Sequence, residues 1–150
     1  MPTRPDTTPS ATRPTGEWPD SIAVAQLRIA RPTDRLEDVV RFYRDGLGLP
    51  VITAFEGHAG YDGVIVGLQD RSSHLEFTHH QEGSDCPAPS RDNLLVLYIS
   101  DVDDLTRLRD RMFRMGYEAI APGNPYWLDK AVTFADPDAW RVVLCNTQGV

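Results

Sequence analysis

Residues 36–49, LEDVVRFYRDGLGL, decide the fold prediction for this chain. The apolar side chains of this stretch recur at helical spacing, at Leu36, Val39, Val40, Phe42, Tyr43 and Leu47. Such spacing gathers them on one face, so it predicts an amphipathic helix over residues 35–46. Gly46 and Gly48 are expected to end this helix, because glycine readily adopts the left-handed conformation that follows a helix C-terminus.

Strand-like runs lie on both sides of this predicted helix. Ile22–Ala30 precedes it, and its apolar residues alternate with polar ones. Three further runs follow the helix, at Pro50–Phe55, Tyr61–Leu68 and Ser73–His79. The predicted order of elements is therefore strand, helix and three strands.

A second segment repeats this order after a polar, proline-containing linker at residues 81–92. It begins with a strand over Leu94–Ile99. The helix that follows is marked by Val102, Leu105, Leu108, Met112 and Met115, and the last strands are Tyr117–Ile120, Ala131–Phe134 and Arg141–Asn146. The repeat predicts two β-α-β-β-β modules, residues 22–80 and 93–148, in a single α+β domain over residues 21–150.

The composition argues against several classes of function. The chain has 150 residues and a formal net charge of −7, and an acidic surface repels nucleic-acid phosphates and anionic lipids. Nucleic acid and membrane are therefore not expected partners. Cys86 and Cys145 do not make a disulfide framework, and residues 1–20 lack the apolar stretch of a secretory signal. We expect a cytoplasmic protein whose first 20 residues form a disordered Thr/Pro-rich tail.

Three short motifs, taken in order, resemble the vicinal oxygen chelate (VOC) superfamily, which has the glyoxalase and bleomycin-resistance fold. The first is FYRDGLGL at residues 42–49, and the second is ISDVDDL at residues 99–105. The third, FADPDAWR at residues 134–141, resembles a late turn usually written F-x-D-P-D-G. Ala139 stands where that family commonly has glycine. The resemblance covers residues 22–148.

The resemblance implies two curved sheets around a cavity, with helices outside. In metal-dependent members, the first and last strands of each module supply the ligands of a divalent ion, usually histidine and glutamate. The corresponding positions in this chain are Arg28, Glu76, Leu94 and Val143. Only Glu76 can bind a metal, because arginine is permanently cationic and leucine and valine have no donor atoms. We therefore expect no metal ion and no other cofactor at this position.

Strand alternation divides the residues of the first module between two faces. Leu27 and Ile29 suit the face that the helix covers, so Arg28, His74 and Glu76 share the opposite face. Because the first and last strands of a module lie side by side in this fold, we expect Arg28 to pair with Glu76. Two interpretations of the pair are open: a structural salt bridge, or an arginine that binds an anionic or carbonyl oxygen of a ligand. A metal ion shared by His74 and Glu76, outside the family pattern, is a third.

Aromatic residues of the second module are candidates for the wall of the cavity. Both faces of the strand over Leu94–Ile99 are apolar, so alternation does not orient it, but the spacing to the following helix places Tyr98 inward. Tyr126 and Trp127 lie in a loop, where they form either a lid over the ligand or a cover for the end of the sheet. Asp136 and Asp138 are expected to stabilise a turn, because aspartate beside proline is favoured there for backbone reasons.

Together these features predict a small-molecule-binding protein of the glyoxalase/bleomycin-resistance type with a degenerate metal site. Its predicted ligand-binding residues are Arg28, His74, Glu76, Tyr98, Tyr126 and Trp127. The alternative is an enzyme of this fold, a lyase, isomerase or dioxygenase, in which Glu76 is the best catalytic candidate. A third interpretation is a partner-binding domain that uses residues 1–20 as its contact. Because similar family members are often dimers, the resemblance also implies a homodimer.

Overall fold

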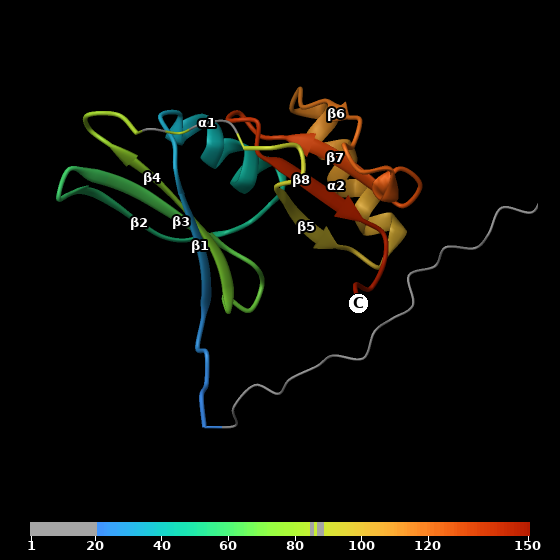
Figure 1. The fold of residues 1–150 in the computed structure, drawn as a ribbon, viewed down its shortest axis with the longest axis horizontal. Coiled ribbons are helices and arrows are strands. Elements are labelled where there is room, and N and C mark those ends of the chain that lie inside the picture. The colour runs from blue at the N-terminus through green and yellow to red at the C-terminus, as the bar shows by residue number, and fades with distance from the viewer. Residues whose placement is uncertain (1–20, 85, 87–88) are drawn as a thin grey trace, which may run out of the picture.

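The computed structural model describes residues 21–84, 86 and 89–150, so the predicted disordered tail at residues 1–20 lies outside the described residues. It contains two four-stranded sheets, one from each module (Figure 1). The strand order is β1-β4-β3-β2 in the first sheet and β5-β8-β7-β6 in the second. This confirms the predicted α+β architecture. Among the described residues, no helix combines the length and apolar content needed to cross a membrane.

The first sheet consists of β1 (Leu27–Pro32), β2 (Val51–His58), β3 (Tyr61–Gly67) and β4 (Ser73–His80). β1 runs parallel to β4, whereas β2 and β4 are both antiparallel to β3. The prediction of a first strand over Ile22–Ala30 is wrong at its N-terminal end. The ladder between β1 and β4 starts at the pair Leu27 and Ser73, so the residues before Leu27 have no strand partner in β4.

The predicted helix over residues 35–46 is present in two parts. The α-helix α1 spans Leu36–Val40, and the π-helical turn η1 spans Arg41–Gly46. The Leu47 N–H donates to the Phe42 carbonyl, five residues earlier, at 3.0 Å. Both parts carry buried apolar residues, as the amphipathic spacing predicts.

The second module contains β5 (Leu94–Tyr98), α2 (Val102–Arg114), β6 (Ala119–Ile120), the 3-10 turn η2 (Pro125–Trp127), β7 (Ala131–Ala135) and β8 (Arg141–Cys145). β5 runs parallel to β8, just as β1 runs parallel to β4. Asp101 caps α2, because its carboxylate accepts the N–H groups of Asp103 and Asp104 at 2.8 and 3.1 Å. The predicted strand Tyr117–Ile120 is shortened to its last two residues, which are the positions paired with β7.

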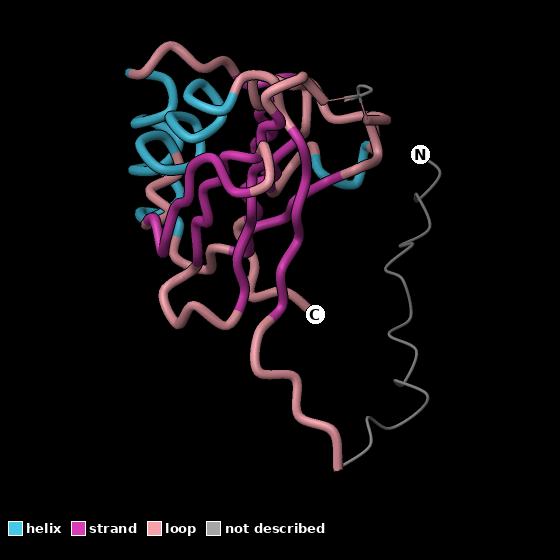
Figure 2. Tube along the Cα trace, turned by 90° about the vertical axis from the view of Figure 1, so that its left-hand side faces the viewer, coloured by secondary structure: helices cyan, strands magenta, loops and turns pink. Residues whose placement is uncertain are grey.

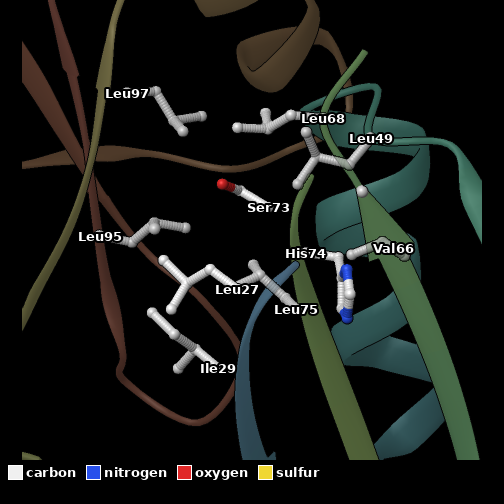
Figure 3. A pocket seen from close by; sticks show the side chains of 11 residues that line it. Leu27, Ile29, Leu49, Val66, Leu68, Ser73, His74, Leu75, Leu95 and Leu97 are labelled. Carbon is white, nitrogen blue, oxygen red and sulfur yellow. The ribbon is translucent and has the colours of Figure 1, made fainter. Parts of the chain in front are cut away.

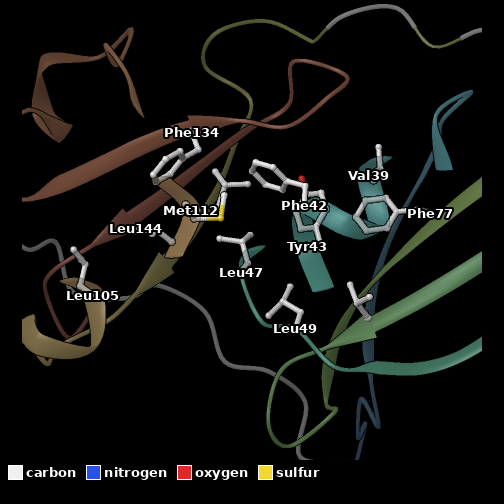
Figure 4. Packing of buried hydrophobic residues seen from close by; sticks show 12 residues of the cluster. Val39, Phe42, Tyr43, Leu47, Leu49, Phe77, Leu105, Met112, Phe134 and Leu144 are labelled. Carbon is white, nitrogen blue, oxygen red and sulfur yellow. The ribbon is translucent and has the colours of Figure 1, made fainter. Parts of the chain in front are cut away.

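The helix-covered faces of the two sheets share one hydrophobic core (Figure 4). Phe42 and Leu47 from the first module belong to the same buried cluster as Met112 and Phe134 from the second. A Cβ atom on Gly46 would lie 2.7 Å from the Met112 Sδ, so the close approach of η1 and α2 depends on this glycine. Most helical turns lie on one side of the strands (Figure 2). The opposite sheet faces, which carry the candidate ligand positions, therefore point away from the shared core.

Candidate functional site

The face of the first sheet opposite the core brings together Arg28, His74 and Glu76. Arg28 on β1 is in register with His74 on β4, and Glu76 lies two positions further along β4. The Arg28 Nε donates to the His74 Nε2 at 3.0 Å, and the Arg28 Nη1 donates to the Glu76 Oε2 at 3.2 Å. The predicted pairing of Arg28 with Glu76 is confirmed. We call these three residues the arginine triad.

His74 takes part in the triad as a neutral acceptor. Because the Nε2 atom accepts the bond from Arg28, the ring proton lies on Nδ1, which is 3.4 Å from the carbonyl oxygen of Arg71. The residue is buried, with 6% of its surface exposed. A fixed imidazole therefore holds the Arg28 side chain at one point, and the Glu76 carboxylate holds it at another.

Arg28 is the accessible member of the triad. Its side chain is 46% exposed, whereas that of Glu76 is 13% exposed. A guanidinium carries five N–H donors. Within the described part of the chain, Arg28 donates hydrogen bonds to His74 and Glu76 alone. Its remaining donors are available to an anionic or carbonyl oxygen of a bound molecule.

Two apolar side chains of β2 lie on the same face. A Cβ atom on Gly67, which is paired with His74, would lie 2.3 Å from the Ile52 Cδ1. A Cβ atom on Gly63, four residues earlier on the same face of β3, would lie 2.3 Å from the Phe55 ring. Ile52 and Phe55 therefore extend across β3 beside the triad. Sequence analysis missed both residues, although glycines inside a strand are a known sign that another group approaches closely.

The donor set does not fit the metal site that the family resemblance implies. Arg28 occupies one of the four positions, and Leu94 and Val143, which have no donor atoms, lie in the other sheet. Among the residues with described positions, no three His, Cys, Asp or Glu side chains are grouped closely enough to hold an ion. His74 and Glu76 are only two metal-ligating side chains, and both accept hydrogen bonds from Arg28. These residues suit a guanidinium at this place better than a divalent cation.

The predicted aromatic residues belong to the second module and not to the sheet of the triad. Tyr98, at the end of β5, is 46% exposed. Tyr126 and Trp127 lie in η2, where their rings pack edge to face with centroids 4.9 Å apart. The Lys130 Nζ lies 3.3 Å from the centroid of the Tyr126 ring. Lysine thus occupies the ring face that a cationic ligand would use. A role for these three aromatic residues in ligand binding stays a prediction.

A second polar group is buried between the two modules. The Arg31 guanidinium bonds to the Asp136 carboxylate and, at 2.8 Å, to the Asp138 carboxylate. The Tyr43 hydroxyl donates to the same Asp136 Oδ2 at 2.8 Å. The Arg31 guanidinium also lies 5.3 Å from the centroid of the Trp140 ring. We call this group the inter-module network, because it joins β1 and η1 to the turn between β7 and β8.

Asp136 also stabilises the turn that its sequence predicts. Its Oδ1 accepts the N–H groups of Asp138 and Trp140 at 2.9 and 3.0 Å. Burial raises the pKa of Asp136, while the charge of Arg31 and the hydrogen bond from Tyr43 oppose that rise. Burial, followed by the charge of Asp136, raises the pKa of the Tyr43 hydroxyl. Sequence analysis identified the turn but not its buried arginine partner.

Comparisons with known proteins cover both modules. The family models described as the YycE-like N-terminal domain and the YycE-like C-terminal domain match residues 27–78 and 92–146. The chain is 45% identical over 130 residues to the uncharacterized protein YycE of Bacillus subtilis (strain 168). That match covers 87% of this chain and 94% of the relative.

Solved structures share the fold. A YycE protein of unknown function from Bacillus subtilis, for which a glyoxalase/fosfomycin resistance role is suggested, has a TM-score of 0.83 and 44% identity. The similarity covers 87% of this chain and 96% of that chain. The antibiotic-binding protein TnmS3 from Streptomyces sp. CB03234 has a TM-score of 0.58 and 21% identity, over 83% of this chain and 97% of that chain. At that identity, the second likeness shows the fold alone.

Proposed function

The chain belongs to the YycE-like family of the VOC superfamily, and from this premise we propose that it binds a small molecule through the arginine triad without a metal ion. The observation that carries the proposal is the position of Arg28. Its guanidinium is bonded to both His74 and Glu76, at a position where metal-dependent members of the superfamily have a ligand for the ion.

The proposed ligand has an anionic or carbonyl oxygen next to an apolar group. The free donors of Arg28 match such an oxygen, and Ile52 and Phe55 on the same face match the apolar part. Because the Arg28 side chain is 46% exposed, its free donors can reach a molecule in solution. The precedent for binding is TnmS3, a structural neighbour described as an antibiotic-binding protein.

The competing proposal is an enzyme in which Glu76 acts as a base and Arg28 stabilises a developing oxyanion. Its support is the partial exposure of Glu76, whose Oε2 accepts from Arg28. This alternative predicts turnover that is lost in Glu76→Gln. The binding proposal predicts affinity without turnover.

We further propose that the chain forms a homodimer in a cytoplasmic setting, as similar proteins of the superfamily do. The two faces that carry Arg28 and Val143 point away from the shared core of one chain. Multi-angle light scattering of the full chain tests the oligomeric state directly.

Calorimetric titration in a buffer that contains EDTA tests the binding proposal. The probes are fosfomycin, benzoate and phenylphosphonate, which combine an anionic group with a small apolar part. We expect at least one probe to bind the full chain saturably in the presence of chelator. Arg28→Met should weaken that binding at least tenfold, because the free guanidinium donors are lost.

Arg44→Met is the matched control. Arg44 has a similar exposure of 49% and pairs with its sequence neighbour Asp45. Its replacement should leave the affinity within twofold. If none of the probes binds, or if Arg28→Met binds them as tightly as the unmodified chain does, the triad is a structural salt bridge and the proposal fails.

A further inference from the structure

A cavity of about 140 Å³ lies between the two modules, on the opposite face of the first sheet from the triad. Leu27 and Ile29 of β1 border it on one side, and Leu95 and Leu97 of β5 border it on the other (Figure 3). The rest of the lining comes from Leu49, Val66, Gly67, Leu68, Ser73, His74 and Leu75. The imidazole of His74 points away from the space (Figure 3), and its Nε2 accepts from the Arg28 Nε at 3.0 Å. The lining is therefore almost wholly aliphatic.

The apolar residues of β1 are too exposed to be ordinary core. Leu27 and Ile29 are each 56% exposed, although they lie on the same face of the sheet as the partly buried Leu75. Both side chains border the space between the modules, and the rest of their surface is open to solvent at the edge of the sheet. A dry apolar cavity of about 150 Å³ in a protein can hold a molecule the size of benzene. The cavity here has both the size and the lining for such a guest.

One polar group is directed into this apolar space. The Ser73 hydroxyl points toward the middle of the cavity (Figure 3). In the part of the chain that the structure describes, this hydroxyl makes no hydrogen bond, whereas the hydroxyl of the preceding Ser72 donates to Asp70 at 2.7 Å. A free hydroxyl in an aliphatic lining provides a single specific contact for a ligand.

A wider hollow continues the cavity along the edge of β5. The two share Leu49, Leu68 and Leu97, and the hollow extends to the side chains of Asp70 and Tyr98. A larger molecule therefore has room for a polar extension outside the apolar cavity.

We propose that the inter-module cavity binds a small uncharged molecule that consists of one ring or a short branched alkyl group with one hydrogen-bonding atom. Phenol is the simplest probe of this class. The volume of the cavity limits the ligand to about the size of one ring. Within the ranges that the structure describes, no charged side chain lines the cavity, so an ion would lose its hydration without gaining a partner. The Ser73 hydroxyl supplies the hydrogen bond. His74 is the one lining residue that also belongs to the arginine triad, and its imidazole bonds to Arg28 rather than to a molecule in the cavity.

Proton NMR titration of the full chain with phenol and with toluene tests the proposal. Both should bind saturably with one-to-one stoichiometry. Ser73→Ala should weaken phenol binding about threefold to tenfold, the worth of one hydrogen bond, and leave toluene binding within twofold. Ile29→Trp should abolish binding of both, because its larger side chain fills the cavity from an exposed position that tolerates substitution.

Val24→Trp is the control, because Val24 is 61% exposed and does not line the cavity. It should bind both probes as the unmodified chain does, and so should Arg28→Met, which removes only the triad. Three results would overturn the proposal: no saturable binding, binding that survives Ile29→Trp, or binding that disappears as the dimer fraction rises with concentration. The last would mean that a second copy fills the cavity.

Discussion

Replacing Arg31 by methionine should lower the free energy of unfolding by about 3–5 kcal/mol, which is the usual cost of leaving a buried charge without its partner. Arg31 is the only cation of the inter-module network among the described residues, with a side chain that is 10% exposed. The Asp136 side chain beside it is fully buried. Methionine preserves most of the aliphatic stem but removes the charge and all the donors.

The contacts of Asp136 and Arg31 narrow the expected loss of unfolding free energy in Arg31→Met. After the substitution, Asp136 would retain three hydrogen bonds, one from Tyr43 and two from backbone N–H groups. Those bonds reduce the loss, so the ion-pair part should be close to about 3 kcal/mol. Arg31 also lies 4.9 and 5.3 Å from the ring centroids of Phe77 and Trp140, and losing these cation–π contacts adds about 0.5–1 kcal/mol each. The total should be about 4 kcal/mol.

Urea unfolding followed by tryptophan fluorescence measures this loss. The control is Arg35→Met, because Arg35 donates to the Pro137 carbonyl and to Asp38 from a side chain that is 54% exposed. That variant should lose less than about 1 kcal/mol. Arg31→Met combined with Asp136→Asn should lose about 2 kcal/mol less than the sum of the single losses, because the neutral amide no longer needs a cation. A loss below about 1 kcal/mol in Arg31→Met, or additivity in the double variant, would refute the reasoning.

Three other substitutions have defined outcomes. Ala139 has a φ of +69°, so Ala139→Gly should relieve left-handed strain and raise the free energy of unfolding by about 0.5–1 kcal/mol in urea titrations; an unchanged midpoint would contradict this. Asp101→Ala removes the cap of α2 and should lower that free energy by about 1 kcal/mol by the same measurement, whereas Asp101→Asn should retain most of it. The Ser72 hydroxyl and N–H hold the pKa of Asp70 below its usual value, so Ser72→Ala should raise that pKa in an NMR titration. Because the folded pKa is lowered, the stability that Asp70 contributes is present above its unfolded pKa and is lost as the pH falls; a pKa of Asp70 unchanged in Ser72→Ala would exclude the serine as the cause.

The pairing of Arg28 with Glu76 was predictable from the sequence because it depends on strand alternation and on the strand order that the family resemblance implies. Alternation decides that Arg28, His74 and Glu76 share a face, and the parallel pairing of the first and last strands of a module brings them together. Nothing in that inference requires knowledge of how the modules pack. The role of His74 as the acceptor from Arg28 was not predicted, because it depends on the rotamers of both side chains.

Features that depend on module packing were not predictable in the same way. Alternation assigned Leu27 and Ile29 to the helix-covered face, but their exposure is decided by the position of β5, which lies almost 70 residues further along the chain. The bond between Arg31 and Asp136 joins residues 105 positions apart, and each alone has an ordinary local explanation, as a strand residue and as a turn residue. The extent of β1 likewise depends on where β4 begins.

The inter-module network and the cavity lie along the same face of β1, and this leads to one more prediction. Arg31 follows Leu27 and Ile29 on that face and ties its end of β1 to the second module. Arg31 does not line the cavity, so Arg31→Met leaves all the lining side chains unchanged. It removes the ion pair that joins β1 to the second module, and the distance between β1 and β5 then becomes less fixed. We therefore expect phenol binding to weaken at least threefold in folded Arg31→Met, measured by NMR under conditions where circular dichroism shows the native fold. Arg35→Met should bind phenol normally. Equal affinity in Arg31→Met and Arg35→Met would show that the core shared by Phe42 and Met112 fixes the module spacing without help from the network.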